Sequence, residues 1–287
     1  MLVLNRAEPV DVVIAPTVDA FVERYVRRER PVVVRGGLAD WLPMQRWTLD
    51  HLKAAGGARR VKIGVSNSGV FVNYAERLNL GVDPEIAFAE VVDGIFSSSK
   101  GAENRRLHQE PLEGWGALDE ESTPIRYITR PVMAKNIWMG SAGNVTKAHY
   151  DTEDNINVQL RGRKEFFLFP AAQLDALYPR SAWDYMSNFS RVDITAPDLA
   201  RYPRFSRATP MRAVTEPGDF LYIPIYWWHQ VHTLEASLNV NFWCVARTRQ
   251  AMRWNGLRYW PRIVKDGYLL AHVARTLRGS IESHVRG

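Results

Sequence analysis

The chain has 287 residues, 46% of them hydrophobic and 24% charged, a balance typical of a globular protein with a sizeable core. No apolar run approaches the roughly 20 residues that span a bilayer, and the start lacks the apolar stretch of a signal peptide, so we expect no membrane partner. The single cysteine, Cys244, excludes an intramolecular disulfide and a cysteine-based zinc site, and it favours a reducing, cytoplasmic compartment.

The formal net charge of +6 is unevenly distributed. Residues 245–287 contain nine basic and two acidic residues, a net +7, so the rest of the chain sums to −1. A general nucleic-acid-binding protein more often spreads its basic residues along a groove. The excess positive charge is therefore a property of the tail.

The first part of the chain shows alternating helix and strand signals. Thr17 is a candidate N-cap for a helix with one apolar face, and "RPVVVRGG" is typical of a buried strand that ends in a glycine turn. Thr48 is a second candidate N-cap, for a short helix that ends at Gly56–Gly57. A further helix is expected from Pro84 to about Phe96, with proline at its first position.

Residues 97–124 are rich in Gly, Ser, Glu and Pro and predict a long loop. Strand signals dominate from Ile125 to Ala246, in short segments that turn residues separate. These segments are "RYITRP", "AKNIWMG", "NINVQL", "KEFFLF", "MRAVTEPGDFLYIP" and "SLNVNFWCVA". The pattern predicts a β-sandwich or barrel. The layout is then a helix and strand shell at 1–124, an all-β core at 125–246, and a basic, helical region at 247–287 with an apolar stripe.

Several strands in the all-β core carry polar side chains on one face. Side chains in a strand alternate between faces, so His149 and Asp151 point to one side. Asn155 lies on the polar face of the next segment, and Lys164 follows the Arg161–Gly162 turn. In a single sheet such a face would meet solvent, whereas in a barrel it can enclose a ligand.

Two histidines and one carboxylate are a common ligand set for non-haem iron. The sequence offers two His-x-acid motifs, His149-Tyr-Asp151 and His108-Gln-Glu110, and the second falls in the expected loop, so we interpret it as a chance match. A third ligand should come from a later strand of the same barrel. His229 and His232, in "YWWHQVH", are both candidates on spacing alone.

Several blocks of the sequence, taken together, are similar to one known family. "NVTKAHYDTEDNINVQLRGRKEFFLFP", "PGDFLYIPIYWWHQV" and "VNFW", with an upstream "RPVVVRGGLADWLPMQRWTLDHLKAAGG", resemble the JmjC/cupin-like 2-oxoglutarate oxygenases over about residues 15–246. Within them the likeness is greatest to the subgroup with the asparaginyl hydroxylase of hypoxia-inducible factor. The resemblance implies a mainly β fold with α elements, a double-stranded β-helix (cupin or jelly-roll) core, an N-terminal α/β shell and C-terminal helices.

The resemblance also implies a site. Fe(II) would be held by His149, Asp151 and His229, which favours His229 over His232. The positions that contact the cosubstrate 2-oxoglutarate in this family correspond to Thr146, Asn155, Lys164 and Asn241, with Tyr127 a weaker match, and Trp243 corresponds to an aromatic residue near the metal. Lys164 suits the distal carboxylate as a point charge. O2 is the implied oxidant.

The implied reaction is hydroxylation of an unactivated C–H bond of a peptide or protein side chain, with 2-oxoglutarate converted to succinate. The same chemistry on a small molecule or on a tRNA base stays open, as does demethylation after hydroxylation of an N-methyl group. A metal-binding cupin without oxygenase activity is a further alternative. For the tail we expect helices that form a homodimer, because an apolar stripe accompanies its arginines.

Overall fold

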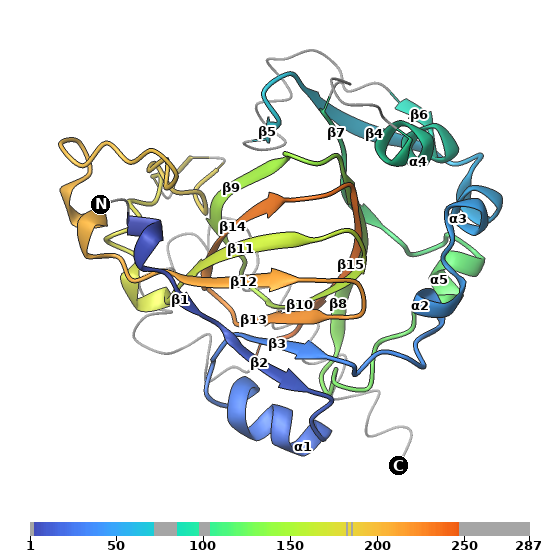
Figure 1. Cartoon of the computed structure of the whole chain (residues 1–287), viewed down its shortest axis with the longest axis horizontal. Helices are drawn as coiled ribbons and strands as arrows, with labels where there is room; N and C mark the ends of the chain where they lie inside the picture. The colour runs from blue at the N-terminus through green and yellow to red at the C-terminus, as the bar shows by residue number, and fades with distance from the viewer. Residues whose placement is uncertain (1–2, 72–84, 98–103, 182, 185, 247–287) are drawn as a thin grey trace.

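The fold is known from a computed structural model that describes residues 3–71, 85–97, 104–181, 183–184 and 186–246. Two β-sheets face each other and form a barrel, and strands β9, β14, β11 and β12 are its front wall in Figure 1. The smaller sheet is, in spatial order, β1 (Glu8–Pro9), β12 (Met211–Thr215), β11 (Lys164–Phe169), β14 (Trp228–Thr233), β9 (Val145–Tyr150) and β5 (Val70–Phe71).

The larger sheet forms the opposite wall. In spatial order its strands are β2 (Asp11–Ile14), β3 (Val32–Arg35), β13 (Phe220–Ile223), β10 (Asp154–Arg161), β15 (Ser237–Cys244), β8 (Val132–Gly140), β7 (Asn104–Pro111), β4 (Arg60–Ser66) and β6 (Glu85–Ala87). From β8 onward the chain crosses between the walls after β8, β9, β10, β12, β13 and β14, as in a jelly roll. The predicted fold class, mainly β with a jelly-roll core, is confirmed.

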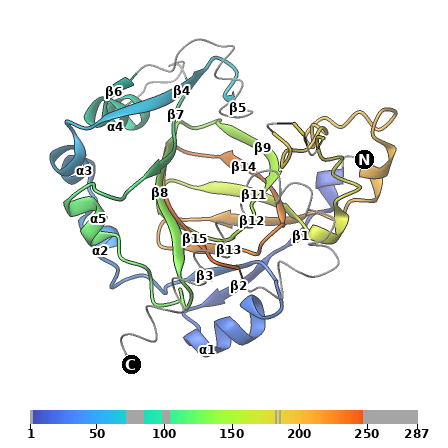
Figure 2. The same cartoon turned by 180° about the vertical axis from the view of Figure 1, so that it is seen from behind.

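Short helices cover the outer side of the larger sheet. They are α1 (Val18–Phe21), which continues as a π-helical turn (Val22–Val26), α2 (Leu42–Arg46), α3 (Leu49–Gly56), α4 (Phe88–Phe96) and α5 (Ala117–Glu121). Figures 1 and 2 show α2 to α5 along one side of the barrel and α1 beneath β2 and β3. Both expected N-caps form, because Thr17 accepts from Ala20 N–H and Thr48 from His51 N–H. No helix among the described residues is long and apolar enough to cross a membrane.

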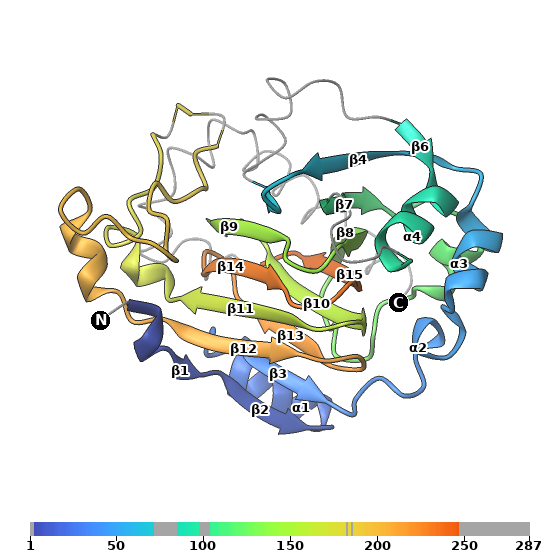
Figure 3. The same ribbon diagram turned by 45° about the horizontal axis from the view of Figure 1, so that its top comes forward.

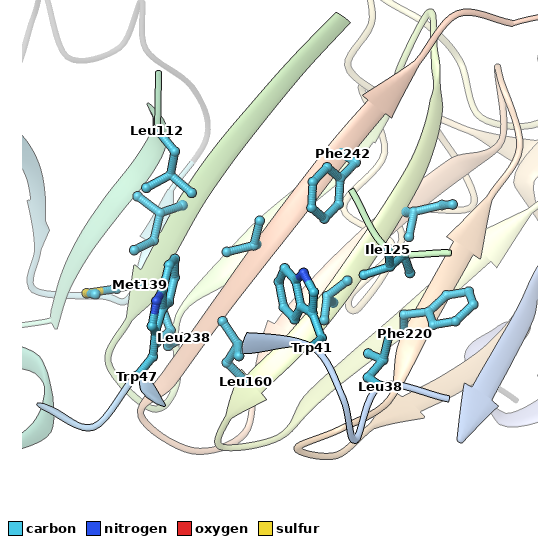
Figure 4. Close-up of a cluster of buried hydrophobic side chains, with 14 of the residues drawn as sticks. Leu38, Trp41, Trp47, Leu112, Ile125, Met139, Leu160, Phe220, Leu238 and Phe242 are labelled. Carbon is cyan, nitrogen blue, oxygen red and sulfur yellow. The ribbon is translucent and has the colours of Figure 1, made fainter. Parts of the chain in front are cut away.

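The main core lies between this helical layer and the larger sheet. Alternation in β10 and β15 sends Ile156, Val158, Val240 and Phe242 outward into it. Figure 4 shows Trp41 and Trp47, from the helical side, packed against the apolar side chains of the sheet. Because these strands bury their apolar face here, their polar face is left to line the barrel.

A second core lies outside the smaller sheet, under the segment that follows β11. It contains Tyr150 and Trp228 from the sheet, with Ile194 and Phe205 from residues 170–207. Figure 3 shows this segment, in yellow and orange, outside the barrel beside the N-terminal turn. Three-residue and five-residue 3-10 turns, Ala171–Gln173 and Pro203–Arg207, lie within it, and Val3–Arg6 forms another. The segment is thereby anchored to the strands that carry the two histidines of the predicted site.

Three sequence expectations about local structure are wrong. The expected loop contains strand β7 and helix α5, because β7 pairs with β4 and β8 although its sequence has little apolar alternation. "RYITRP" forms turns instead of a strand, since Pro131 lacks the N–H that a ladder requires and β8 starts at Val132. The expected helix before Phe96 starts at Phe88, after β6.

Strands from before residue 124 pair with strands of both sheets. Before it, β1 pairs with β12 of the smaller sheet, and β3 pairs with β13 of the larger one. The described part of the N-terminal shell therefore extends the barrel walls as well as covering them. The expected helices of the C-terminal region lie outside the described residues.

Candidate active site

Three side chains that could bind a metal ion converge at one end of the barrel. His149 is the penultimate residue of β9, Asp151 follows that strand directly, and His229 lies opposite His149 in the β9–β14 ladder. Their ligand atoms all lie within 4.8 Å of one another. The Nε2 atoms of His149 and His229 are 3.9 Å and 3.8 Å from the two carboxylate oxygens of Asp151. One strand pair therefore assembles the whole triad.

Both imidazoles are held in one tautomer by backbone carbonyls. Nδ1 of His149 lies 2.8 Å from the Lys147 carbonyl oxygen, and Nδ1 of His229 lies 3.0 Å from that of Trp227. A carbonyl only accepts, so each Nδ1 carries the proton and each Nε2 presents its lone pair to the triad. Burial and the neighbouring His229 lower the pKa of His149, which keeps its imidazole neutral and able to bind a metal ion.

The Asp151 carboxylate is oriented by a chain of amides. Asn155 Nδ2 donates to Asp151 Oδ2 at 3.2 Å, and Asn155 Oδ1 accepts from Asn241 Nδ2 at 3.4 Å. Asn241 Oδ1 in turn accepts from Trp138 Nε1 at 2.7 Å and from Asn136 Nδ2 at 3.2 Å. Strands β8, β10 and β15 thus act through this network on one metal-side oxygen atom.

Lys164 places a buried cation on the inner surface of the barrel. It opens β11 between Thr215 and Thr233 of the neighbouring strands, and its ammonium donates to Asn239 Oδ1. Desolvation, and then the charge of Arg106, lower the pKa of Lys164 to about 7. A nearby anion would stabilise the charged ammonium and offset most of this lowering of the pKa.

The barrel lining has buried polar atoms that no described residue satisfies. They are Asn157 Oδ1, Ser237 Oγ, Asn239 Nδ2 and Trp243 Nε1. Asn157, Asn239 and Trp243 share the inner face with Asn155 and Asn241 by strand alternation. Buried polar groups in native proteins have partners, so the interior of the barrel fits a polar ligand that supplies both donors and acceptors.

Phe189 covers one side of the triad. Its ring stacks on the His149 ring with centroids 5.0 Å apart and planes inclined by 14°. Backbone bonds fix it there, because Ser190 N–H donates to Ala148 and Tyr150 N–H to Asn188. No sequence signal indicated Phe189.

Thr146 and Trp243 lie on strands of the barrel, whereas Tyr127 lies outside it. Thr146 is on β9 with His149, and Trp243 is the register partner of Asn155. The Tyr127 hydroxyl donates to the Pro16 carbonyl oxygen at 2.8 Å, and its ring packs against Phe21 in the core outside the larger sheet. Tyr127 does not line the barrel because it precedes β8 in a turn instead of lying in a strand.

The rival metal ligands are elsewhere. His232 faces away from the barrel, with Nδ1 3.3 Å from Glu165 Oε2 and its ring against Phe167. His108 packs its ring edge to face on Trp138, and neither it nor Glu110 joins the metal-binding group found among the described residues. The His-x-acid motif of β7 is thus separate from the triad, although β7 is a strand.

Comparison with known proteins assigns the fold and site to a family. The sequence profile of the cupin-like domain family matches residues 18–247, and the chain belongs to this family. It is 27% identical over 228 residues to the lysine-specific demethylase 8 of Xenopus tropicalis, covering 79% of this chain and 51% of that one. It is 30% identical to the lysine-specific demethylase JMJ30 of Arabidopsis thaliana, covering 79% of this chain and 52% of the relative.

A third relative is matched over most of its length. The human bifunctional peptidase and (3S)-lysyl hydroxylase JMJD7 is 25% identical over 265 residues, with 79% of this chain and 81% of the relative covered. The chain spans only about half the length of the two demethylases. These findings confirm the resemblance to JmjC/cupin-like proteins over the region that carries the triad.

The residues present fit the groups that the family resemblance implies. Two imidazoles and one carboxylate on one side of a site are the ligand set of non-haem Fe(II) oxygenases, and they leave coordination positions open. The buried ammonium of Lys164 and the unsatisfied donors and acceptors along the barrel lining match a small dicarboxylate that also carries a keto oxygen.

Proposed function

We propose that this chain is an Fe(II)- and 2-oxoglutarate-dependent dioxygenase that hydroxylates a C–H bond of a peptide or protein side chain. The observation that carries the proposal is the convergence of His149, Asp151 and His229 with Nε2 atoms free, in a barrel whose lining includes buried Lys164. When bound, the iron, 2-oxoglutarate and O2 supply the oxidation: one oxygen atom enters the substrate and the other enters succinate, and CO2 is released.

Each side chain has a defined task in this account. His149, Asp151 and His229 bind the metal, and Asn155 holds the carboxylate of Asp151 in orientation. Lys164 binds the distal carboxylate of 2-oxoglutarate, and Thr146 is placed to add a hydrogen bond to it. Phe189 keeps water from one side of His149.

A polypeptide substrate is supported by the relatives' names. Two are called lysine-specific demethylases and one a lysyl hydroxylase, all of which denote action on lysine. Hydroxylation of a side-chain carbon and oxidative loss of an N-methyl group both begin with attack on a C–H bond, so the same site suits either outcome. A small molecule or a tRNA base as substrate is an alternative result of the test below.

We further propose a cytoplasmic homodimer. The only cysteine, Cys244, is buried and unpaired, which supports a reducing compartment. The apolar positions among the arginines of residues 247–287 support a helical pairing element.

A turnover screen tests the proposed reaction. Purified protein with Fe(II) and 2-oxoglutarate should release succinate in step with a mass gain of one oxygen atom, or loss of a methyl group, in a peptide library. His149→Ala should abolish succinate release, whereas His232→Ala should retain it, because His232 faces away from the barrel. If only an amino-acid or a tRNA pool is modified, the substrate belongs to that class and is not a polypeptide. If no pool gives turnover, a non-catalytic cupin is favoured.

A further inference from the structure

The turn at residues 224–227, between β13 and β14, has a backbone conformation that its own sequence does not favour. Trp227 N–H donates to the Pro224 carbonyl oxygen at 3.2 Å and closes the turn. Tyr226, the third residue, has a φ of 63°, in the left-handed region where glycine or asparagine is usual. A tyrosine keeps this conformation only where surrounding contacts compensate for its cost. Neighbouring segments therefore hold the turn in place.

This turn lies between two of the candidate metal ligands. His229 follows it by two residues, and the carbonyl oxygen of Trp227 accepts the proton on Nδ1 of that histidine at 3.0 Å. On the other side of the turn, Tyr226 N–H donates to the Asp151 carbonyl oxygen at 3.0 Å. The conformation of the turn thus fixes the ring of His229 relative to the backbone of Asp151.

A buried carboxylate bonds to the same turn. Asp154 begins β10, three residues after Asp151, and its side chain is 1% exposed. Its Oδ1 accepts from Ile225 N–H at 2.8 Å, and the next N–H along the chain is that of Tyr226. Two successive N–H groups of the turn are therefore bonded to residues 151–154. The bond to the carboxylate is the stronger kind, because its acceptor is charged.

Arg130 fixes the carboxylate of Asp154. Its Nη2 donates to Asp154 Oδ2, and its own side chain is only 16% exposed. Its Nη1 donates to the Val245 carbonyl oxygen at 3.1 Å, and Val245 N–H donates to the Pro131 carbonyl oxygen at 3.0 Å. The guanidinium is thereby anchored at the end of β15. A buried carboxylate is strongly unfavourable without such a partner, so the two residues act as a unit.

We infer that Asp154, held by Arg130, is a positioning residue that maintains the geometry of the metal-binding triad. It acts through the turn at residues 224–227, which orients His229 against Asp151. Neither member of the ion pair belongs to the group of candidate metal ligands found among the described residues. The inference rests on the proposed function and deepens it, because it names two residues of the site that no sequence motif indicated.

The test measures metal affinity and backbone protection in the full chain, without turnover. Asp154→Ala should weaken Mn(II) binding on the order of 10- to 100-fold, the usual effect of losing an outer partner of a metal site, as followed by electron paramagnetic resonance of the free ion. In the metal-free protein, the N–H groups of residues 225 and 226 should exchange with solvent faster than in the wild type. Asp154→Asn keeps an oxygen that can accept from Ile225 N–H, so it should recover part of both losses. It is also the test variant if Asp154→Ala does not fold.

Asp219→Ala is the matched control. Asp219 is also a buried carboxylate beside an arginine: its Oδ2 lies 3.2 Å from Arg35 Nε and accepts from Glu216 N–H at 3.1 Å. It precedes β13, whereas the turn at residues 224–227 follows that strand, so it lies toward the other end of the barrel. Asp219→Ala should bind Mn(II) like the wild type and leave exchange in the turn unchanged, although it too loses a buried ion pair.

The failures of the two proposals are distinguishable. Wild-type Mn(II) affinity in Asp154→Ala, with or without faster exchange, would overturn the positioning role while leaving the proposed oxygenase in place. An equal loss of affinity in Asp154→Ala and Asp219→Ala would do the same, because it would reflect general destabilisation. If the wild type itself does not bind Mn(II), the proposed function fails, and the positioning role fails with it.

Discussion

At the scale of single residues, the amides around Asp151 do more than fill the barrel. Asn155 was expected to contact the cosubstrate, and the structure shows it bonded to Asp151 and Asn241. Because Asn155 holds Oδ2 of Asp151, the other carboxylate oxygen points toward the metal site in a fixed direction. Asn155 is therefore a positioning residue for the metal site, and its effect should appear in metal affinity.

Asn155→Ala should weaken Mn(II) binding roughly 10- to 100-fold, the usual cost of losing a partner of a metal ligand. Titration of the metal, followed by electron paramagnetic resonance of the free ion, measures the change without turnover. Asn157→Ala is the control on the same face of β10, because Asn157 makes no hydrogen bond to Asp151. Equal metal affinity in the wild type and Asn155→Ala would refute the positioning role.

The lowered pKa of Lys164 makes cosubstrate binding dependent on pH. In the ligand-free protein this pKa is about 7, against an ordinary value of 10.5. The folded state thus holds the proton less tightly than the unfolded chain, and the contribution of Lys164 to the free energy of unfolding rises with pH between these values. An anion at the ammonium reverses this preference, so binding at pH 8 to 9 must take up a proton.

Calorimetry of 2-oxoglutarate binding in two buffers of different ionisation enthalpy should show proton uptake above pH 7. The dissociation constant should rise by up to tenfold per pH unit there. Lys164→Met should bind weakly at every pH and take up no proton. Uptake that is unchanged in Lys164→Met would assign the titration to another group.

At the scale of elements, three helices of the outer layer are joined to one another by one buried carboxylate. Glu121, at the end of α5, accepts hydrogen bonds from Trp47 Nε1 and His51 Nε2, both at 2.9 Å, and from Arg46 at 3.3 Å. Burial raises its pKa, but these three donors outweigh burial and leave the pKa below its ordinary value. The carboxylate therefore ties α2, α3 and α5 together in its charged form.

Glu121→Ala should lower the free energy of unfolding by about 2–3 kcal/mol, because it removes charge-assisted bonds and leaves the buried Trp47 N–H without its acceptor. Urea unfolding followed by tryptophan fluorescence measures this difference. Glu120→Ala, an exposed change on the same helix, should stay within about 0.5 kcal/mol of the wild type. Equal losses in the two variants would show that the network contributes nothing specific.

The sequence predicted elements well where one physical signal dominated. Alternation fixed the faces of β10 and β15, and capping side chains marked the starts of α1 and α3. Strand β7 was missed because its inner face carries Arg106 and His108 where a buried strand usually carries apolar residues. A polar inner face is what a ligand-binding barrel requires, so the same feature that hid the strand marks it as part of the site.

The residues of the candidate site were likewise predictable only in part. Spacing and family resemblance gave the triad, because its members lie in two conspicuous blocks of sequence. Spacing could not give Phe189 or Arg106, since long-range pairing brings them to the site: Phe189 forms an isolated bridge with His149, and β7 reaches Thr146 from the other sheet. Only the register of the sheets shows which face each side chain takes.

At the scale of the whole molecule, we propose different roles for the tail and for the barrel. The tail pairs two chains, and the barrel binds the cosubstrate. Removal of residues 247–287, which carry the excess positive charge, should convert a dimer into a monomer in sedimentation velocity while leaving 2-oxoglutarate binding intact. A dimer that persists after truncation would contradict the dimerisation role. Salt-dependent RNA binding that is lost on truncation would instead support the tRNA alternative.

We propose that the triad and Lys164 hold Fe(II) and 2-oxoglutarate together in one barrel. Anaerobic titration of the Fe(II)-loaded protein with 2-oxoglutarate, followed by visible absorption, tests this most directly. We predict a metal-to-ligand charge-transfer band that saturates at one equivalent, is lost in His149→Ala, and requires more ligand in Lys164→Met. If no band forms in the wild type, or if it persists unchanged in His149→Ala, the proposed site is wrong.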